Sequence, residues 1–239
     1  MKAVLEKSYD LRPNDFNCYG KLTPSAILDI FQDMAGRHSI IMGADLESLK
    51  KKGLFWVVAK IRFEFLGEAK MYQTVKVKTW PLKPSRVTFR RECLISDLEG
   101  NPIVRGSTEW VVVDTVKRRI ASSDGVYSLN DGDYLEEVAF DDRISKVPTF
   151  EASGNAFKIC PRFSDFDVNG HVNNTKYAAF AFDALAESEN KLDFNYFQID
   201  YHKEVLSGEE LSIYIKKESD RILFLGKGEG ETKFSCFIK

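Results

Sequence analysis

The sequence predicts an α+β protein in which one structural unit, a helix followed by antiparallel strands, occurs twice along the chain. Three observations indicate this fold class. Two apolar segments have helical periodicity, strand-like runs follow each of them, and the two halves match each other in pattern. With 239 residues, of which 44% are hydrophobic, the chain is long enough to bury one large core or two small ones.

The first half begins with a short polar segment and continues into a helix. Thr23 is a suitable N-cap, Pro24 suits the first helical position, and Gly43 is a suitable stop. One face of this helix is apolar, and its residues recur at helical spacing: Ile27, Ile30, Phe31, Met34, His38 and Ile41. The strands expected after it cover residues 55–65, 74–80, 86–96 and 103–114.

The second half repeats this order. A helix is expected from Asn174 to about Glu189, and because it is apolar nearly all round we expect it to be buried on most sides. The strands expected after it cover residues 196–203, 211–217, 221–228 and 232–238. The pattern of 61–65 recurs at 199–203, an offset of 138 positions (199 minus 61), which indicates duplication.

These elements predict three parts of the chain. Residues 1–120 form the N-terminal unit, residues 157–239 form the C-terminal unit, and residues 121–156 form a connector. The connector is acidic and rich in turn residues, so we expect it to cross the surface with room for one short helix. A helix wrapped by a curved antiparallel sheet is the hotdog arrangement, and two such units would share a continuous sheet around two central helices.

Composition excludes several function classes. The 34 basic and 36 acidic residues leave a net charge of −2, which argues against a protein that coats nucleic acid. The four cysteines are scattered without a paired spacing, so we expect reduced thiols. We see neither a signal peptide nor an apolar run of roughly 20 residues, and expect a cytoplasmic protein without a membrane span. We expect no metal and no cofactor, since metal-ligand clusters and Gly-rich phosphate loops are lacking.

The residues just ahead of the second helix are the most informative about chemistry. They place an acid, an amide and an imidazole at alternate positions, Asp167, Asn169 and His171, which project to one side of an extended chain. An amide and helix N-terminal N–H groups suit a developing oxyanion, and an imidazole moves protons near neutral pH. The set suits thioester hydrolysis beside a dry acyl slot, although each residue alone also fits a capped turn.

The motif from Asp167 to Tyr177, Asp-x-Asn-x-His-Val-Asn-Asn-x-Lys-Tyr, resembles the active-site motif of the acyl-ACP thioesterases of plants and bacteria. The resemblance covers almost the whole chain in collinear order. Its other motifs are Phe31-Gln32-Asp33-Met34-Ala35 with His38, Trp56-Val57-Val58, Thr79-Trp80, Arg90-Arg91-Glu92 and Trp110-Val111-Val112. The resemblance implies a tandem hotdog fold. It also implies hydrolysis of fatty acyl-ACP to free fatty acid and holo-ACP in fatty acid biosynthesis.

The resemblance also implies site residues. Asp167, Asn169 and His171 match the family's catalytic aspartate, asparagine and histidine. Glu204 matches a glutamate proposed to be catalytic, and Val205 stands where the family has a cysteine once proposed as the nucleophile. A covalent cysteine mechanism at that position is therefore excluded here.

The first half lacks a second copy of this set. Residues 15–20 keep an Asp and an Asn without the histidine, and position 66, the parallel of Glu204 by the same offset of 138 (204 minus 66), is leucine. We therefore expect one active site, with the first half serving acyl binding.

The mechanism expected from these residues is a single displacement by water. Glu204 and His171 position and deprotonate the water, with the choice of base between them left open. Asn169 and helix amides hold the thioester oxygen, while Asp167 orients the site. Attack by Asp167 to give a mixed anhydride is the alternative route.

Two further groups of residues are candidates for binding. The acyl tunnel would be bounded by Ile30, Met34, Ile41, Phe55, Trp56 and Trp80, for which plain core packing is an equal alternative. Acyl carrier protein is acidic, so basic runs are candidates for docking it: Lys50-Lys51-Lys52, Arg90-Arg91 and Lys117-Arg118-Arg119. An acyl-CoA hydrolase, a hotdog dehydratase and a non-catalytic acyl-binding sensor stay open as alternatives, and a homodimer is suggested by analogy alone.

Overall fold

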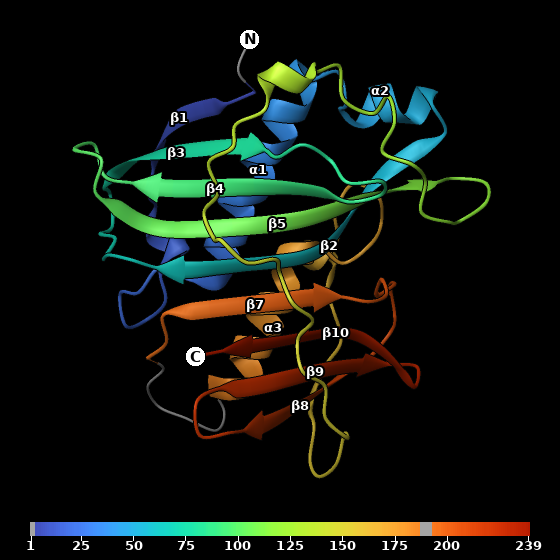
Figure 1. Ribbon diagram of the computed structural model, residues 1–239. Coiled ribbons are helices and arrows are strands. Elements are labelled where there is room, and N and C mark those ends of the chain that lie inside the picture. The colour runs from blue at the N-terminus through green and yellow to red at the C-terminus, as the bar shows by residue number, and fades with distance from the viewer. Residues whose placement is uncertain (1–2, 187–192) are drawn as a thin grey trace. The chain divides into compact units, whose positions relative to one another are not determined.

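The computed structural model describes residues 3–186 and 193–239 (Figure 1). The chain divides into two compact units, Met1–Ile144 and Ser145–Lys239. Each unit holds an antiparallel sheet with an α-helix against it, which confirms the predicted α+β class. The division between the units falls inside the segment 121–156, where the sequence predicts a connector.

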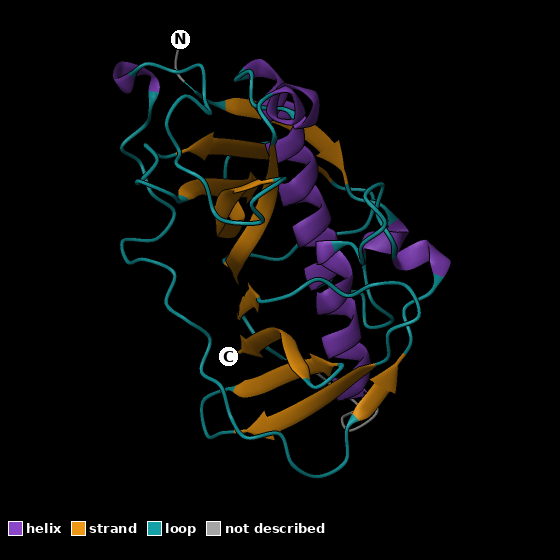
Figure 2. Cartoon of the chain, turned by 90° about the vertical axis from the view of Figure 1, so that its right-hand side faces the viewer, coloured by secondary structure: helices purple, strands orange, loops and turns teal. Residues whose placement is uncertain are grey.

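The first unit is a five-stranded sheet in the order β1-β3-β4-β5-β2, in which all neighbours are antiparallel. Its strands are β1 (Leu5–Asp10), β2 (Leu54–Phe65), β3 (Thr74–Pro81), β4 (Phe89–Ser96) and β5 (Pro102–Asp114). Its α-helices are α1 (Pro24–Ile41) and the short α2 (Leu46–Lys51). Figure 2 shows α1 as a layer separate from the sheet.

Helix α1 forms where its sequence signals place it. The Thr23 hydroxyl accepts a hydrogen bond from the Ala26 amide at 3.2 Å, and proline occupies the first turn. Ile27, Ile30, Phe31 and Met34 are at most 1% exposed, and full burial of such a side chain contributes about 1.5–3 kcal/mol. These four residues form the apolar face that the periodicity predicts.

Ile41 was expected on this apolar face, and that expectation is wrong. Ile41 is the last residue of α1 and is 62% exposed. The next residue, Met42, is the C-cap, and its side chain is buried in its place at 1% exposure. The buried positions Met34, His38 and Met42 follow one another at intervals of four, so the apolar face reaches Met42 and leaves Ile41 toward solvent.

The close contact between α1 and the sheet depends on one glycine of β5. A Cβ atom on Gly106 would lie 2.1 Å from Cε2 and 2.5 Å from Cζ of the Phe31 ring. The Phe31 ring therefore lies directly over the backbone of β5, in space that any side chain at position 106 would occupy. Gly106 lets the helix approach the sheet to this distance.

The second unit repeats the architecture of the first. Its strands are β6 (Phe157–Ile159), β7 (Tyr196–Tyr201), β8 (Leu211–Lys217), β9 (Ile222–Gly228) and β10 (Glu231–Ile238), and its helix is α3 (Asn174–Ala186). The order β6-β8-β9-β10-β7 matches β1-β3-β4-β5-β2 strand for strand. This match confirms the duplication. The expected end of the second helix near Glu189 lies outside the described residues.

A segment after β5 covers the face of the first sheet opposite α1. The Arg62 guanidinium donates to the Asp142 carboxylate at 2.9 Å, and it also lies 4.1 Å from the centre of the Phe140 ring. Glu92, which is fully buried, accepts hydrogen bonds from the Ser107 hydroxyl at 2.6 Å and the Ala139 amide at 3.0 Å. The segment ending at Ile144 is thus packed against the sheet as part of this unit.

A polar cluster lies within the first unit, near the C-terminal end of α1. The Arg91 guanidinium lies 3.0 Å from Nδ1 of His38 and donates to the Thr79 hydroxyl at 3.2 Å. His38 and Arg91 are 2% and 3% exposed. His38 is therefore the hydrogen-bonded core residue that its place on the apolar face predicts. Burial of Arg91 contradicts the prediction that Arg90-Arg91 forms a docking run, because alternate residues of a strand face opposite sides.

Candidate active site

Asp167 organises the turn that precedes α3. Its carboxylate Oδ1 accepts hydrogen bonds from the amides of Asn169 at 2.8 Å and His171 at 3.2 Å, and Oδ2 accepts from the Asn169 side chain at 3.2 Å. Gly170 closes the turn with φ +79°, a left-handed conformation that glycine adopts without strain. The side chain of Asn173 accepts from the Thr175 amide at 3.1 Å and so caps α3.

His171 faces Glu204 from this turn. Its Nε2 lies 3.3 Å from Oε2 of Glu204, and the two side chains are 38% and 42% exposed. The turn and the loop after β7 are also joined through the backbone, since the Val172 amide donates to the Val205 carbonyl at 3.2 Å. The structure therefore brings Asp167, Asn169, His171 and Glu204 together, across more than thirty positions of sequence.

The neighbouring residues Tyr177, Tyr201 and His202 are held by hydrogen bonds. The Tyr177 hydroxyl accepts from the Val205 amide at 3.1 Å, and burial raises the pKa of Tyr177 well above its usual range. The Tyr201 hydroxyl donates to the Asn174 carbonyl at 2.9 Å. His202 turns away from the cluster, with Nε2 3.0 Å from the Ser235 hydroxyl, and burial lowers its pKa.

The first unit contains a structural counterpart of this site. Asn17 accepts from the amides of Tyr19 and Lys21, both at 3.0 Å, as Asp167 does from the amides of Asn169 and His171. Lys21 then forms an ion pair with Glu68 at 3.4 Å. The counterpart thus holds a lysine–glutamate pair where the second unit holds a histidine–glutamate pair.

The counterpart of Glu204 is Glu68, and the assignment of position 66 is wrong. The amides of Leu66 and Gly67 both donate to the Ile103 carbonyl, as those of His202 and Lys203 both donate to the Lys233 carbonyl. This hydrogen bonding aligns 66 with 202, and therefore 68 with 204, an offset of 136 (204 minus 68) in place of 138. The described first unit still lacks a histidine in this arrangement.

The residues predicted to bound the acyl tunnel are spread over different parts of the first unit. Ile30 and Met34 lie buried under the sheet on α1, whereas Ile41 is exposed. Trp80 lies on the opposite face of β3 from Thr79, where its indole Nε1 donates to the Glu137 carbonyl at 2.8 Å.

Phe55 and Trp56 lie at the start of β2. Trp56 packs against Phe89 with ring centres 4.7 Å apart, in a cluster that also contains Trp110 and Tyr127. Ile30 and Met34 are thus the two predicted residues that share one surface, that of α1.

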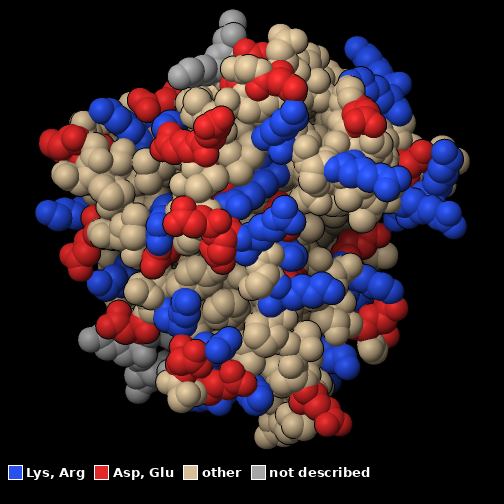
Figure 3. Space-filling model, viewed as in Figure 1, with Lys and Arg blue, Asp and Glu red and all other residues tan. Residues whose placement is uncertain are grey.

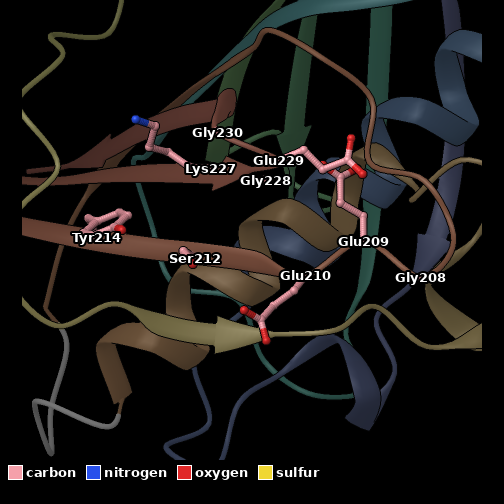
Figure 4. Close-up of a pocket in the computed structure, with 9 residues that line it drawn as sticks. All are labelled: Gly208, Glu209, Glu210, Ser212, Tyr214, Lys227, Gly228, Glu229 and Gly230. Atoms are coloured by element: carbon pink, nitrogen blue, oxygen red, sulfur yellow. The ribbon is translucent and has the colours of Figure 1, made fainter.

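A hollow in the second unit opens near the turn between β9 and β10 (Figure 4). Its lining is mainly polar and includes Glu209, Glu210, Ser212, Tyr214, Lys227 and Glu229. A hollow of this polarity does not suit an acyl chain. It borders Glu209, one of two residues next to the site that sequence reasoning missed.

The missed residues are Glu209 and Lys233. Their side chains form an ion pair at 2.6 Å and are 4% and 6% exposed, and the Lys233 ammonium also donates to the Glu204 carbonyl at 3.2 Å. The sequence carries a weak signal of this pair, because Lys233 directly precedes the largely apolar stretch from Phe234 to Ile238.

Two of the basic runs converge in space at the surface of the first unit. Thr115, just before Lys117-Arg118-Arg119, donates through its amide to the carbonyl of Gly53, just after Lys50-Lys51-Lys52, at 2.9 Å. All six cations are exposed. Figure 3 shows basic side chains gathered at the right-hand edge, over the turn that follows β5.

Comparison with known proteins matches both halves of the chain to domains of one protein family. Residues 2–125 match the acyl-ACP thioesterase N-terminal domain and residues 149–236 match the C-terminal domain of the same family. The palmitoyl-acyl carrier protein thioesterase of Cuphea hookeriana is 28% identical over 73% of this chain and 45% of its own. The oleoyl-acyl carrier protein thioesterase 1 of Arabidopsis thaliana is 25% identical over 76% of this chain and 55% of its own. The chain therefore spans about half the length of these curated relatives.

Solved structures show the fold. An acyl-ACP thioesterase from Bacteroides thetaiotaomicron superposes with a TM-score of 0.84, covering 99% of this chain and 97% of that chain at 21% identity. The 12:0-ACP thioesterase from Umbellularia californica gives 0.85, covering 100% and 97% at 22% identity. This likeness confirms the predicted tandem hotdog fold. Among the described helices, none combines the length and apolar character that a membrane-spanning helix requires.

Proposed function

Because the chain belongs to the acyl-ACP thioesterase family, we propose that it hydrolyses the thioester of fatty acyl-ACP to free fatty acid and holo-ACP. The observation that carries the proposal is the approach of His171 Nε2 to Glu204 Oε2 at 3.3 Å, beside the turn that carries Asn169. Both side chains are partly exposed, so a water molecule has access to them.

In the proposed reaction, the His171–Glu204 pair binds a water molecule and takes its proton as the oxygen attacks the thioester carbonyl. The side-chain amide of Asn169, together with the amides at the start of α3, stabilises the negative charge that develops on the carbonyl oxygen. The C–S bond then breaks, and the leaving thiolate takes the proton from the pair. Asp167 holds the turn, since its carboxylate accepts three hydrogen bonds there.

Within the first unit we propose that α1 contributes the surface that binds the acyl chain, through Ile30 and Met34. This proposal keeps the roles expected from the sequence, in which the first unit binds the acyl chain and the second unit holds the catalytic residues. The counterpart site supports it, because it pairs Glu68 with Lys21 and so lacks the imidazole that the second unit offers as a base.

The proposed partner is acyl carrier protein, docked on the basic surface formed by Lys50-Lys51-Lys52 and Lys117-Arg118-Arg119. The segments 45–52 and 114–119 carry these six cations and three carboxylates, Asp45, Glu47 and Asp114, which leaves a local charge of +3 (6 minus 3). An acidic carrier protein is complementary to such a surface, and long-range attraction of this kind raises the association rate.

The experiment that tests the proposal is the release of thiol from matched acyl-ACP and acyl-CoA substrates by the wild type and by His171→Ala. Faster turnover of acyl-ACP that His171→Ala abolishes is the expected result. Preference for acyl-CoA would make the protein an acyl-CoA thioesterase. Binding of acyl-ACP without thiol release would make it a sensor. Release that is unchanged in His171→Ala would remove the proposed site.

A further inference from the structure

The loop that carries Glu204, residues 202–210 between β7 and β8, is bound through its backbone at three consecutive residues. The Lys233 ammonium donates to the Glu204 carbonyl at 3.2 Å. The Val205 amide donates to the Tyr177 hydroxyl at 3.1 Å, and the Leu206 amide donates to Oε2 of Glu209 at 3.2 Å. Groups from β10, from α3 and from the loop itself therefore fix the backbone just after the Glu204 side chain, and the amides of His202 and Lys203, which donate to the Lys233 carbonyl, fix it just before.

Two of these groups form a buried ion pair. Lys233 Nζ lies 2.6 Å from Oε1 of Glu209, and their side chains are 6% and 4% exposed. Removing two charges from water is costly, and replacing such a pair by packed apolar side chains is often neutral or stabilising. The pair is therefore a poor device for stability alone. The pair does fix the position of the loop, because Lys233 and Glu209 each also bind a backbone group of it.

An irregularity in β10 turns Lys233 into this position. The pairing of β10 with β9 shifts between Thr232 and Phe234, so that Lys233 is an extra residue at a β-bulge. Bulges change the direction of a side chain and are frequent beside active sites. Without the bulge, Lys233 would point to the face of the sheet opposite that of its neighbour Phe234, because successive side chains of a strand alternate.

We propose that Lys233 and Glu209 are positioning residues, which hold the loop so that the Glu204 carboxylate meets His171 at 3.3 Å. This inference rests on the proposed function, in which that pair activates water. Neither residue touches the reacting atoms. Displacement of a catalytic group by about 1 Å costs on the order of 100-fold in rate, so a residue that sets its position affects turnover more than substrate binding.

The test compares buried and exposed members of the same region. Lys233→Met and Glu209→Gln remove one charge each from the buried pair. The matched controls are Lys158→Met and Glu210→Gln, which break the adjacent exposed pair at 2.7 Å, whose side chains are 65% and 48% exposed. We expect kcat on acyl-ACP to fall at least about tenfold in the first two variants, with KM within about twofold of the wild type. Both controls should stay within about twofold in kcat.

A double-mutant cycle separates positioning from a general loss of structure. If Lys233 acts through Glu204, Lys233→Met has no carboxylate left to misplace in a Glu204→Gln background. The double variant should then be no slower than Glu204→Gln within about twofold, whereas independent effects would multiply. Multiplied effects would overturn the inference. If Lys233→Met does not fold, as its thermal melt would show, the isosteric Glu209→Gln is put through the same cycle and judged by the same criteria.

The proposed function and this inference fail in different ways. Full activity of both Glu204→Gln and His171→Ala would sink the proposed site, and the positioning role with it. Loss of activity in these two variants, combined with wild-type kcat in Lys233→Met and Glu209→Gln, would overturn the positioning role alone.

Discussion

At the scale of single residues, the two units hold the same backbone turn with different side chains. Asp167 and Asn17 each accept hydrogen bonds from two later amides of their turn. An amide therefore supports this turn as well as a carboxylate does. The negative charge of Asp167 is not needed for the local fold, which makes this position suitable for separating structural from chemical roles.

We predict that Asp167→Asn keeps the turn and loses less than about tenfold in kcat, about 1.4 kcal/mol in the barrier, because in the proposed mechanism the residue orients the site without attacking the substrate. Asp167→Ala, which removes the acceptor oxygens, should lose more. The measurement is steady-state turnover of acyl-ACP, with circular dichroism to check folding. A folded but inactive Asp167→Asn would mean that the carboxylate takes part in the chemistry.

The buried His38 makes stability depend on pH. Burial first, and then the positive charge of Arg91, lowers its pKa from 6.5 to about 4. In the unfolded chain the pKa returns to its ordinary value, so the unfolded state binds a proton more readily than the folded state does. The stability contributed by neutral His38 is thus complete above pH 6.5 and decreases as the pH falls toward 4, by up to about 3 kcal/mol.

We predict that His38→Gln flattens this pH dependence, because glutamine offers Arg91 a neutral acceptor that does not titrate. The free energy of unfolding, measured by urea denaturation between pH 4 and 7.5, should change less with pH in His38→Gln than in the wild type. His202 has a lowered pKa too and would account for part of the remaining slope. An unchanged slope in His38→Gln would contradict the assignment.

The site was predictable from sequence to the extent that it is local. Asp167, Asn169 and His171 lie within five consecutive residues, so the sequence placed them near one another. The extended conformation assumed for them is wrong, because Gly170 and the hydrogen bonds of Asp167 close the segment into a turn. Glu204 required the family resemblance, because nothing local relates it to His171. Glu209 and Lys233 were missed, since their contact depends on a β-bulge that reverses the expected direction of a strand residue.

At the scale of elements, packing of α1 on β5 depends on the absence of a side chain at Gly106. We predict that Gly106→Ala lowers the free energy of unfolding by about 1–3 kcal/mol, because the new methyl group displaces the Phe31 ring. Gly36→Ala is the matched control, since Gly36 lies within α1 and a Cβ there meets no atom within 4 Å. This change should raise stability by about 0.5–1 kcal/mol. Equal effects of the two substitutions on the denaturation midpoint would refute the packing argument.

The strands that sequence reasoning found have a buried face, and the two strands that it missed, β1 and β6, do not. Strands β3, β8 and β10 begin and end within one residue of the expected positions. Strands β1 and β6 are the outer strands of the two sheets, and β1 is largely exposed, so they lack the apolar alternation that marks a strand. Strand β4 starts at Phe89, three residues later than expected, since Thr88 and Ser85 form a turn.

At the scale of the whole molecule, duplication has left two copies of one architecture with different side chains at the turn before the helix. The repeated strand order and the repeated turn are visible in the sequence as pattern, which is why the fold class could be predicted. The exact offset could not, because it changes along the chain. The copies of the turn differ by 150 positions (167 minus 17), the ends of β2 and β7 by 136 (202 minus 66), and β5 and β10 by 130 (233 minus 103). Depth and shape of an acyl tunnel depend on side-chain packing that a sequence pattern does not specify.

Docking through the basic surface would make activity depend on salt. We predict that kcat/KM for acyl-ACP falls as salt rises from 0.05 to 0.5 M, whereas turnover of a small thioester stays nearly constant, because salt screens charges farther apart than about 10 Å at 0.1 M. A Lys117→Glu/Arg118→Glu/Arg119→Glu variant should raise KM for acyl-ACP about tenfold. Lys7→Glu, an exposed lysine on β1, is the control. Equal losses in both variants would refute docking at this surface.

Direct attack by water is best tested by a single turnover in ¹⁸O-labelled water with enzyme in excess over acyl-ACP. If the His171–Glu204 pair activates water, the fatty acid released in that turnover carries one ¹⁸O atom, and peptides containing Asp167 and Glu204 stay unlabelled. An unlabelled fatty acid together with ¹⁸O in an enzyme carboxylate would contradict the mechanism, because it would show that a side chain attacked the thioester first.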